Sequence, residues 1–479
     1  MIRRTLYILL LLVVILDAAY SFMQHYGAPL DGDIAESVVP AEHFKPVLEN
    51  VLGIRAIKYG EAYPNPNRFF VHWSYREYMI SFPVFLQRFT DPISSVYLST
   101  AIAKIIIQLS LIMLLPFTIS GTFNLLRLKF ILAAFLVTPL FQTEGYRSYM
   151  GIIDPAITYT FSYALPALLL LLYFLPFIMH FYHSKKRENQ LLLGLLFLPL
   201  GLVVSLSGPL NPGIVLVIAL LVFLGFLSFI FRGSQSMAFP ERIRKAFQRI
   251  PIIYWVLMGL ISMLSLYSLY LGQYNSHQAI YPFSLSELYL SIPQGIYEIV
   301  TEKPGFPILF LILAVNSMII SRKLKSEEGK KILNVFKWIG LFALIYILLL
   351  PLGGYREYRP YVLRYDTILP ITLALVFMFG ATTLYIIKHI KKSNRRWYFP
   401  LVAAVLLTYT FADNSGFSNN SCEKAALEKI SGSSENVVKV DDACTVLSWD
   451  LIKDPKDSDL NARLLQKWGI SDRKVLYFQ

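Results

Sequence analysis

The sequence predicts an all-α polytopic membrane protein, and three observations support this interpretation. Of its 479 residues, 55% are hydrophobic and 16% are charged, whereas a soluble domain carries about 25% charged residues. The hydrophobic residues fall into separate runs near the length of about 20 that a helix needs to cross a bilayer. Basic residues gather in alternate gaps between these runs. A transmembrane barrel is excluded, because its strands would not form a continuous apolar run such as Tyr163 to Tyr182.

The apolar runs predict about eleven transmembrane helices. They lie at residues 5–22, 95–118, 128–142, 158–182, 190–206, 212–231, 250–272, 305–321, 333–352, 368–387 and 398–412. An alternative for the first run is a cleaved signal peptide, because Arg3 and Arg4 precede its apolar core and small residues follow it. In either case the loop after this run is expected outside the cytoplasm.

Basic residues recur at every second gap, and this alternation predicts the orientation of the chain. The clusters are Arg3 and Arg4; Arg127 and Lys129; Lys185, Lys186 and Arg187; Arg232, Arg242, Arg244, Lys245 and Arg249; Arg322, Lys323, Lys325, Lys330 and Lys331; and Lys388, Lys391, Lys392, Arg395 and Arg396. By the positive-inside rule these gaps are cytoplasmic. We therefore expect an integral protein of the bacterial cytoplasmic (inner) membrane, with a cytoplasmic N-terminus and a periplasmic C-terminus. The net charge of +13 reflects this sorting rather than nucleic-acid binding.

Two units are predicted along the chain: a transmembrane unit at residues 1–412 and a small extracytoplasmic C-terminal domain at residues 413–479. The first outer loop, residues 23–91, is longer than a connection between helices requires, and long structured loops are usually functional. Its aromatic stretches, broken by Pro and Gly, predict helices that lie at the membrane interface. A second aromatic outer loop, at about residues 273–305, predicts another interfacial helix.

The polar C-terminal domain contains both cysteines of the chain, Cys422 and Cys444. In an oxidising compartment they would close a loop of about twenty residues, worth about 3 kcal/mol in the chain-entropy model, so we expect a disulfide. Two unpaired thiols are the alternative if the orientation is shifted by one span. The last four residues, LYFQ, match the remnant of a common protease tag, so no function is assigned to them.

The first outer loop opens with an acidic motif, in which Asp31, Asp33 and Glu36 fall within six residues. Carboxylates near a bilayer surface are partly desolvated, which raises their pKa values toward the range of a general base or lets them hold a divalent cation. Gly32 allows a sharp turn that brings neighbouring carboxylates together. The local alternative is a helix cap, with Asp33 at the N-cap and Glu36 at the capping-box position.

The last outer loop, Gly353 to Pro370, is rich in arginine and tyrosine. These residues are Arg356, Arg359, Arg364, Tyr355, Tyr358, Tyr361 and Tyr365. Short outer loops are normally poor in basic residues, so these arginines need another explanation. Arginine binds phosphate through two parallel hydrogen bonds, which suits a lipid-linked phosphate head group. The alternatives are arginines that snorkel to phospholipid, or a salt bridge from Arg364 to Asp366 or Glu357.

Further substrate-binding candidates lie in the outer gap between residues 141 and 159 and in the first loop. Glu144, Arg147 and Asp154 occupy that gap, where charged residues either line a cavity or simply end helices. His72 lies among aromatic residues and either orients a substrate or packs at the interface. Lys104, inside a predicted span, is expected to face the bundle or to snorkel.

Several chemistries lack support in the sequence. There is no phosphate-binding Walker motif, no dinucleotide-binding glycine motif after a strand, no internal repeat and no metal-ligand spacing of His and Cys. We therefore expect no cofactor and no metal site built from such clusters.

Taken together, these features resemble the GT-C superfamily of integral-membrane glycosyltransferases, such as protein O-mannosyltransferases and lipid A aminoarabinose transferases, which use polyprenyl-phosphate sugars. The resemblance covers the topology of most of the chain. It implies that the acidic motif supplies the catalytic carboxylate, with Asp33 favoured over Asp31. The element RYDTILP, Arg364 to Pro370, resembles the late-loop motif whose arginine contacts the donor phosphate. The chain departs from the family in having Asp-Gly-Asp where the mannosyltransferase-like members have Asp-Glu, and in having a shorter tail than the oligosaccharyltransferase branch.

The resemblance implies an inverting glycosyltransferase that moves a sugar from a polyprenyl-phosphate donor to an acceptor hydroxyl on the extracytoplasmic face. Asp33 or Asp31 would be the base, and Arg364, with Arg359, Arg356 and Tyr365, would bind the donor phosphate. The acceptor is a protein, a lipid or a glycan, and a divalent cation is not favoured. Three alternatives stay open: an O-antigen ligase or polymerase, a transporter or flippase of lipid-linked substrates, and a non-catalytic scaffold. A transporter would predict broken helices or repeat symmetry.

Overall fold

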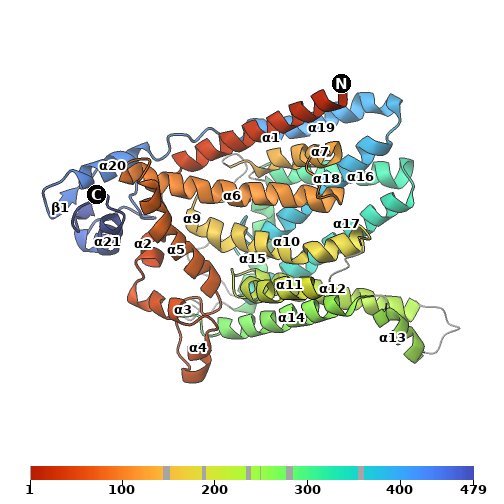
Figure 1. The fold of residues 1–479 in the computed structure, drawn as a ribbon, viewed down its shortest axis with the longest axis horizontal. Helices are drawn as coiled ribbons and strands as arrows, with labels where there is room; N and C mark the ends of the chain where they lie inside the picture. Colours follow the sequence, from red (N-terminus) through yellow and green to blue (C-terminus); the bar gives the residue numbers. More distant parts are fainter. Residues whose placement is uncertain are drawn as a thin grey trace.

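The apolar runs of the sequence form long helices that lie side by side along the long axis of the molecule (Figure 1). The computed structural model describes residues 2–143, 151–185, 190–232, 239–248, 250–276, 284–301, 303–353 and 361–479. Helices make up 74% of the structure. The prediction of an all-α polytopic membrane protein is confirmed.

Within the described residues, eight helices are long and apolar enough to cross a membrane. They are α1 (Ile2–Gly27), α6 (Pro92–Ser120), the continuous helix of α9 (Ile157–Tyr159), η3 (Thr160–Ala164), α10 (Leu165–Phe177) and η4 (Ile178–Tyr182), α12 (Asn211–Arg232), α14 (Ile252–Gly272), α16 (Gly305–Lys323), α17 (Glu327–Leu349) and α18 (Leu369–His389). The other three predicted spans also fall on helices: α7 (Leu128–Val137) with η2 (Thr138–Phe141), α11 (Gln190–Ser205) and α19 (Lys392–Ala412).

The ends of the long helices follow local capping rules. Asp91 caps α6, where its carboxylate accepts a hydrogen bond from the Ser94 backbone N–H at 2.8 Å. Gly121 ends the same helix at a φ of 64°, a left-handed conformation that glycine adopts without steric cost. Ser326 caps α17 by accepting a hydrogen bond from the Gly329 N–H at 3.0 Å.

Polar side chains join helices inside the bundle. Asn316 on α16 donates to the hydroxyls of Thr382 and Thr383 on α18, at 2.9 and 3.0 Å. The Tyr398 hydroxyl on α19 donates to the side-chain amide oxygen (Oδ1) of Asn316 at 2.9 Å. Such bonds hold membrane helices together where burial of apolar surface gives little preference for one partner.

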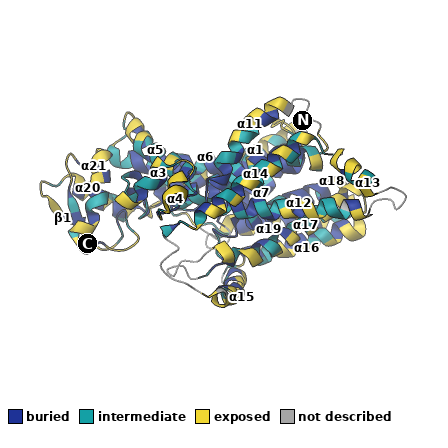
Figure 2. Ribbon diagram, turned by 90° about the horizontal axis from the view of Figure 1, so that it is seen from below, coloured by how far each residue is buried: buried dark blue, intermediate teal, exposed yellow. Residues whose placement is uncertain are grey.

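The outward faces of the helices are apolar. Large exposed side chains on α1 include Leu9, Leu12 and Leu16. Figure 2 shows this pattern, with buried residues inside the bundle and exposed residues along its outer helices. An apolar surface of this extent is what the bilayer core requires, so the chain is an integral membrane protein.

The first outer loop folds into short helices across one end of the bundle (Figure 1). These are α2 (Ile34–Val38), η1 (Glu42–Phe44), α3 (Lys45–Glu49), α4 (Ile54–Tyr59) and α5 (Phe69–Leu86). Tyr63 pairs with the chain after α14, donating from its N–H to the Tyr274 carbonyl at 3.1 Å. The second aromatic loop contains α15 (Leu285–Thr301). The location of these helices at a membrane interface stays a prediction.

The C-terminal tail combines two helices with a small parallel sheet. Its elements are α20 (Ser421–Ser431), β1 (Val437–Lys439), η7 (Pro455–Ser458), α21 (Asp459–Lys467) and β2 (Leu476–Phe478). In the sheet, Val437 of β1 lies opposite Leu476 of β2. A disulfide joins Cys422 to Cys444. The LYFQ residues are part of this fold, because Tyr477 is fully buried within β2.

The tail shares its hydrophobic core with the first outer loop. Leu427 and Trp468 of the tail lie in one buried cluster with Ile34 of α2 and Met79 of α5. The Trp468 indole N–H also donates to the Met79 carbonyl at 2.8 Å. The tail and the first outer loop therefore form one continuous hydrophobic core.

The bundle therefore has two chemically different ends. We call the end that carries α2, α5 and the tail the acidic-motif end (Figure 1). The opposite end carries α13 (Phe239–Gln248) and the connections between α16 and α17 and between α18 and α19. We call it the lysine end, because Lys129, Lys331 and Lys388 line a hollow there. The basic gaps thus gather at one end, while the orientation of that end toward the cytoplasm stays a prediction.

Candidate functional site

Asp31 belongs to the first outer loop and is buried where this loop meets the start of the α9 helix. Its side chain is 4% exposed. One carboxylate oxygen accepts from the Thr158 hydroxyl at 2.8 Å and the other from the Thr158 backbone N–H at 3.1 Å. The Asp33 N–H donates to the first oxygen at 3.2 Å. Asp31 is therefore held in one orientation by neighbours on two segments.

The surroundings of Asp31 raise its pKa. Burial is the largest cause, since it disfavours the charged carboxylate, and the nearby Asp33 adds to it. The hydrogen bonds from Thr158 and the charge of Lys104 act in the opposite direction, and the pKa stands at about 6. Asp31 thus changes protonation close to the pH range in which acid–base catalysis operates.

Asp33 is half-buried and faces the tail. It occupies the N-cap position of α2, but its side chain makes no capping hydrogen bond. Instead, one carboxylate oxygen accepts from the Trp449 indole N–H at 2.8 Å. Glu36 pairs with His43 at 2.6 Å. Asp33 therefore holds the predicted N-cap position, but neither Asp33 nor Glu36 makes the side-chain hydrogen bonds of a capping box.

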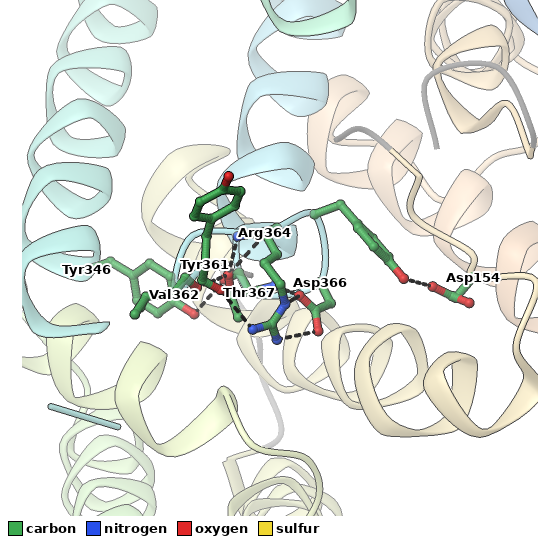
Figure 3. Close-up of polar contacts among 8 residues, drawn as sticks. Asp154, Tyr346, Tyr361, Val362, Arg364, Asp366 and Thr367 are labelled. Carbon is green, nitrogen blue, oxygen red and sulfur yellow. Dashed lines mark hydrogen bonds and ion pairs between the residues drawn. The ribbon is translucent and has the colours of Figure 1, made fainter. Parts of the chain in front are cut away.

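Asp154 forms hydrogen bonds that fix the conformation of the segment leading into the α9 helix. It is 7% exposed, and one of its carboxylate oxygens accepts from the Ala156 N–H at 2.7 Å. The Thr160 hydroxyl donates to the Asp154 carbonyl at 2.8 Å. The Tyr365 hydroxyl, from the last outer loop, donates to the other carboxylate oxygen (Figure 3). Asp154 therefore joins this segment to the arginine- and tyrosine-rich loop.

Arg364 forms a two-bond salt bridge with Asp366 (Figure 3). Its Nε and Nη2 atoms donate to the two carboxylate oxygens at 3.0 and 2.8 Å, and its Nη1 atom donates to the Tyr361 carbonyl at 3.0 Å. The Arg364 side chain is 16% exposed and the Asp366 side chain 3%. The structure thus contains the internal salt bridge that was one alternative for Arg364. Three of the five guanidinium N–H groups are engaged in these bonds.

The acidic motif and the last outer loop meet on one short segment. Thr158 holds Asp31, and Asp154, four residues earlier, holds Tyr365. Four residues span at most about 14 Å even when fully extended. Asp31 contacts one end of this segment and Tyr365 contacts the other, although these two residues are more than 300 positions apart in the sequence.

Lys104 places a buried positive charge in the same region. It lies on α6 with 1% of its surface exposed. Its Nζ atom donates to the carbonyl of Pro155, the residue after Asp154. The expectation that Lys104 faces the bundle is met, and its charge favours the ionised form of Asp31.

The other substrate-binding and phosphate-binding residues predicted from the sequence either lie outside the described residues or have a packing role. Glu144, Arg147, Arg356 and Arg359 lie outside the described residues. His72 lies on α5, where its ring contacts Phe44 at 5.7 Å between centroids, the packing role that was its alternative.

Three functional neighbours of the acidic motif were missed by sequence reasoning: Thr158, Trp449 and Glu423. Glu423 on α20 is buried and accepts from the Leu30 N–H at 2.8 Å and the Leu447 N–H at 3.0 Å. Burial raises its pKa to about 7, against the effect of these two hydrogen bonds. Nothing in the local sequence distinguishes Glu423 from the exposed acids of the tail.

The described residues contain no group of three or more His, Cys, Asp or Glu side chains arranged to hold a metal ion.

Comparisons with known proteins give one structural likeness. No protein-family profile matches the chain, and no curated protein matches its sequence. Among solved structures, the chain is similar to the oligosaccharyltransferase of Archaeoglobus fulgidus in its apo form, with a TM-score of 0.36 and 13% identity. The likeness covers 89% of this chain and 58% of that one.

Proposed function

We propose that the protein is a membrane glycosyltransferase that moves a sugar from a polyprenyl-phosphate donor to an acceptor hydroxyl on the extracytoplasmic face. The observation that carries the proposal is the segment from Asp154 to Thr158. It connects a buried acidic motif, suited to proton transfer, with a loop whose arginine is suited to phosphate. Such a reaction needs a group that takes a proton and a group that binds phosphate, and this segment contacts the motif and the loop that we propose supply them.

Asp33 is the proposed general base. Its carboxylate is half-buried and reachable, with one oxygen anchored by Trp449. Asp31 is more deeply buried and accepts three hydrogen bonds, so it acts as the support that orients the motif. The acceptor oxygen would bond to the anomeric carbon while its proton passes to Asp33 and the carbon–oxygen bond to phosphate breaks. Attack opposite the leaving group inverts the anomeric configuration.

Arg364 is the proposed contact for the leaving phosphate. Its salt bridge to Asp366 holds the guanidinium in a fixed orientation, and one N–H on each terminal nitrogen lies outside the bonds described above. A preorganised donor stabilises charge that grows as the phosphate leaves. The Tyr365 hydroxyl anchors this loop on Asp154, in the same short segment whose Thr158 binds Asp31. The donor is thus a polyprenyl-phosphate sugar in the membrane, and the proposed setting is a bacterial inner membrane.

Transfer from radiolabelled polyprenyl-phosphate sugars, measured in membranes that carry each variant, tests this function. Asp33→Asn is expected to reduce the rate by about 10²- to 10⁴-fold, the usual contribution of a general base. Asp442→Asn, at an exposed acid of the tail, is the matched control and should keep the wild-type rate. Full activity of Asp33→Asn at normal expression would contradict the assignment of Asp33 as the base, and full activity of Asp31→Asn as well would remove the acidic motif from the reaction.

A further inference from the structure

At the lysine end, a hollow of about 390 Å³ lies where the ends of several membrane helices meet, and neither the sequence nor the comparisons assign it a ligand. Its walls come from α6, α7, the end of η4 and the residues after it, α17 and α18. Lys129 of α7, Lys331 of α17 and Lys388 of α18 line it, and we call it the lysine-end hollow. Its volume falls within the range of about 300–1,000 Å³ that is usual for small-molecule sites.

The two carboxylates that line this hollow, Glu327 and Glu328, are already paired. Glu328 forms an ion pair with Lys388 at 3.3 Å. Glu327 forms an ion pair at 2.7 Å with Lys330, which is not part of the lining. Each carboxylate is therefore matched by a lysine, and neither of these pairs uses the other two lysines of the hollow.

Lys129 and Lys331 form no ion pair with a carboxylate among the described residues. The Lys129 Nζ atom donates to the Ser120 carbonyl at 2.7 Å, at the end of α6. The Lys331 Nζ atom donates to the Tyr182 carbonyl, at the end of η4. An ammonium group carries three N–H donors, so each lysine is held by one bond and has further donors for an anion. Both residues are exposed, and an anion can therefore reach them.

His183 lies in the same lining, where the two lysine charges converge. Its Nε2 atom donates to the Thr118 carbonyl at 2.6 Å. Gly121 leaves room for the ring, because a Cβ atom there would lie 2.4 Å from the His183 Nδ1 atom. Burial lowers the pKa of His183, and the charges of Lys129 and Lys331 lower it further, against the effect of the bond to Thr118. Both lysines thus act on one point of the hollow, which gives it a positive potential.

Four of the other lining residues are apolar and belong to membrane helices. Ile119 of α6, Ile332 of α17, and Ala381 and Leu384 of α18 are all buried. The hollow therefore combines a basic rim at the helix ends with an apolar wall inside the bundle. A phospholipid has the same division between its phosphate and its chains, and basic pockets between membrane helices bind anionic head groups.

The general excess of basic residues at this end does not by itself form a site. Lys325 and Lys391 lie in connections between helices at the same end, but neither lines the hollow. Lys129 and Lys331 differ from them because a backbone carbonyl holds each ammonium group at the rim of the hollow.

We propose that the lysine-end hollow binds a phosphate group through Lys129 and Lys331. A phospholipid head group and inorganic phosphate share this chemistry, and the apolar wall favours the phospholipid. The hollow lies at the opposite end of the bundle from the acidic motif, so the inference does not depend on the proposed function.

Native mass spectrometry of the full chain in detergent tests this site, because it counts the bound molecules of each probe. The probes are dioleoylphosphatidylglycerol, dioleoylglycerol, which has the same chains without the phosphate, and sodium phosphate. The wild type should bind one phosphatidylglycerol at least about tenfold more tightly than dioleoylglycerol. Lys129→Ala combined with Lys331→Ala should weaken this binding about 25-fold, or about fivefold for each lysine.

Two further double variants separate the site from a diffuse effect of charge. Lys325→Ala combined with Lys391→Ala removes the same charge from the same end and should keep the affinity within about threefold. Lys129→Arg combined with Lys331→Arg keeps both positive charges in the hollow and should also stay within about threefold of the wild type.

The source of the phosphate follows from which probe binds. Binding of inorganic phosphate alone, lost in the Lys129 and Lys331 alanine variant, would keep the phosphate site and assign it to the free anion. The proposal is overturned if neither phosphate probe binds the wild type, or if dioleoylglycerol binds as tightly as phosphatidylglycerol. It is also overturned if the Lys129 and Lys331 alanine variant keeps the wild-type affinity, or loses no more affinity than the Lys325 and Lys391 variant.

Discussion

The two ends of the bundle both carry exposed ion pairs, such as Lys45 with Glu42 in the first outer loop, but they differ in their buried carboxylates. At the acidic-motif end, four carboxylates are buried and held by hydrogen bonds: Asp31, Asp154, Asp366 and Glu423. At the lysine end, the ion pairs lie in the open, as in Lys388 with Glu328, whose side chains are 59% and 53% exposed. Burying a carboxylate costs free energy unless its partners replace water, whereas an exposed pair neither costs nor contributes much. This difference is the reason why the proposed site is placed at the acidic-motif end.

The largest expected effect is at the buried salt bridge of the last outer loop. Arg364→Gln should destabilise the protein by about 3–5 kcal/mol, because it leaves the buried Asp366 carboxylate without its charged partner. Unfolding by SDS titration in mixed micelles measures the change. The double variant Arg364→Gln with Asp366→Asn should recover part of the loss. A loss below about 1 kcal/mol would place this pair with the exposed pairs of the lysine end.

The second effect is a pH dependence that comes from Glu423. Its pKa of about 7 in the folded protein lies above the ordinary value of 4.5. Its contribution to stability is therefore fully present below pH 4.5 and is lost as the pH rises through 7, a change of about 3 kcal/mol. Glu423→Gln should flatten this dependence, while also weakening the bond to Leu447.

Thermal unfolding between pH 4.5 and 8 measures the Glu423 contribution. The slope is the readout, because it is independent of a constant loss from the missing hydrogen bond. Glu428→Gln, at an exposed position on the same helix, is the control and should keep the wild-type slope. Asp31, with a pKa of about 6, contributes in the same direction. An unchanged slope in Glu423→Gln would show that this carboxyl is not the titrating group.

A smaller effect is expected at the contact between the last outer loop and the α9 segment. Tyr365→Phe removes the hydroxyl that donates to the buried Asp154 carboxylate. Hydrogen bonds to charged groups contribute about 1.5–3 kcal/mol, so SDS unfolding should shift by that amount. Tyr361→Phe is the control, since its hydroxyl lies 3.4 Å from Glu298 in a more open setting and should matter less. Equal losses in both variants would contradict the special role of Asp154.

The smallest effect is expected at the lysine end. Lys388→Ala breaks the exposed pair with Glu328 and should change stability by at most about 1 kcal/mol. Raising the salt concentration should reduce even that difference, since exposed charges are screened. SDS unfolding at low and high salt checks it. A loss comparable to that of Arg364→Gln would remove the contrast between the two ends.

The sequence predicted the helices well because a single local property determines them. The predicted span 212–231 corresponds to α12, Asn211–Arg232, and 368–387 corresponds to α18, Leu369–His389. Continuous apolar composition requires a helix in a bilayer, since every backbone group must then bond within its own segment. The salt bridge of Arg364 with Asp366 was also foreseeable as an alternative, because its partners are two residues apart.

The partners of the acidic motif could not be predicted from the sequence. Thr158 is 127 positions from Asp31, Glu423 is 393 from Leu30, and Trp449 is 416 from Asp33. No periodicity or motif links such residues. The contact of Thr158 exists because the start of the α9 helix packs against the first outer loop, and those of Glu423 and Trp449 exist because the tail folds back onto the same loop. The assignment of Asp33 over Asp31 as base likewise stays a proposal.

By itself, the sequence determined the membrane class, the helical spans and the presence of acid beside an apolar helix, because composition and spacing are enough to set these features. Only the tertiary structure decided which acid is buried, which is reachable, and what holds each of them. Gly32 illustrates the difference: in the sequence it is a permissive turn residue, and in the structure it lies so close to Trp449 that a Cβ atom there would be 2.6 Å from the Trp449 backbone nitrogen. The pKa and the accessibility of a carboxylate depend on its burial and on its contacts with residues far away in the sequence. Neither of these can be read from the local order of residues.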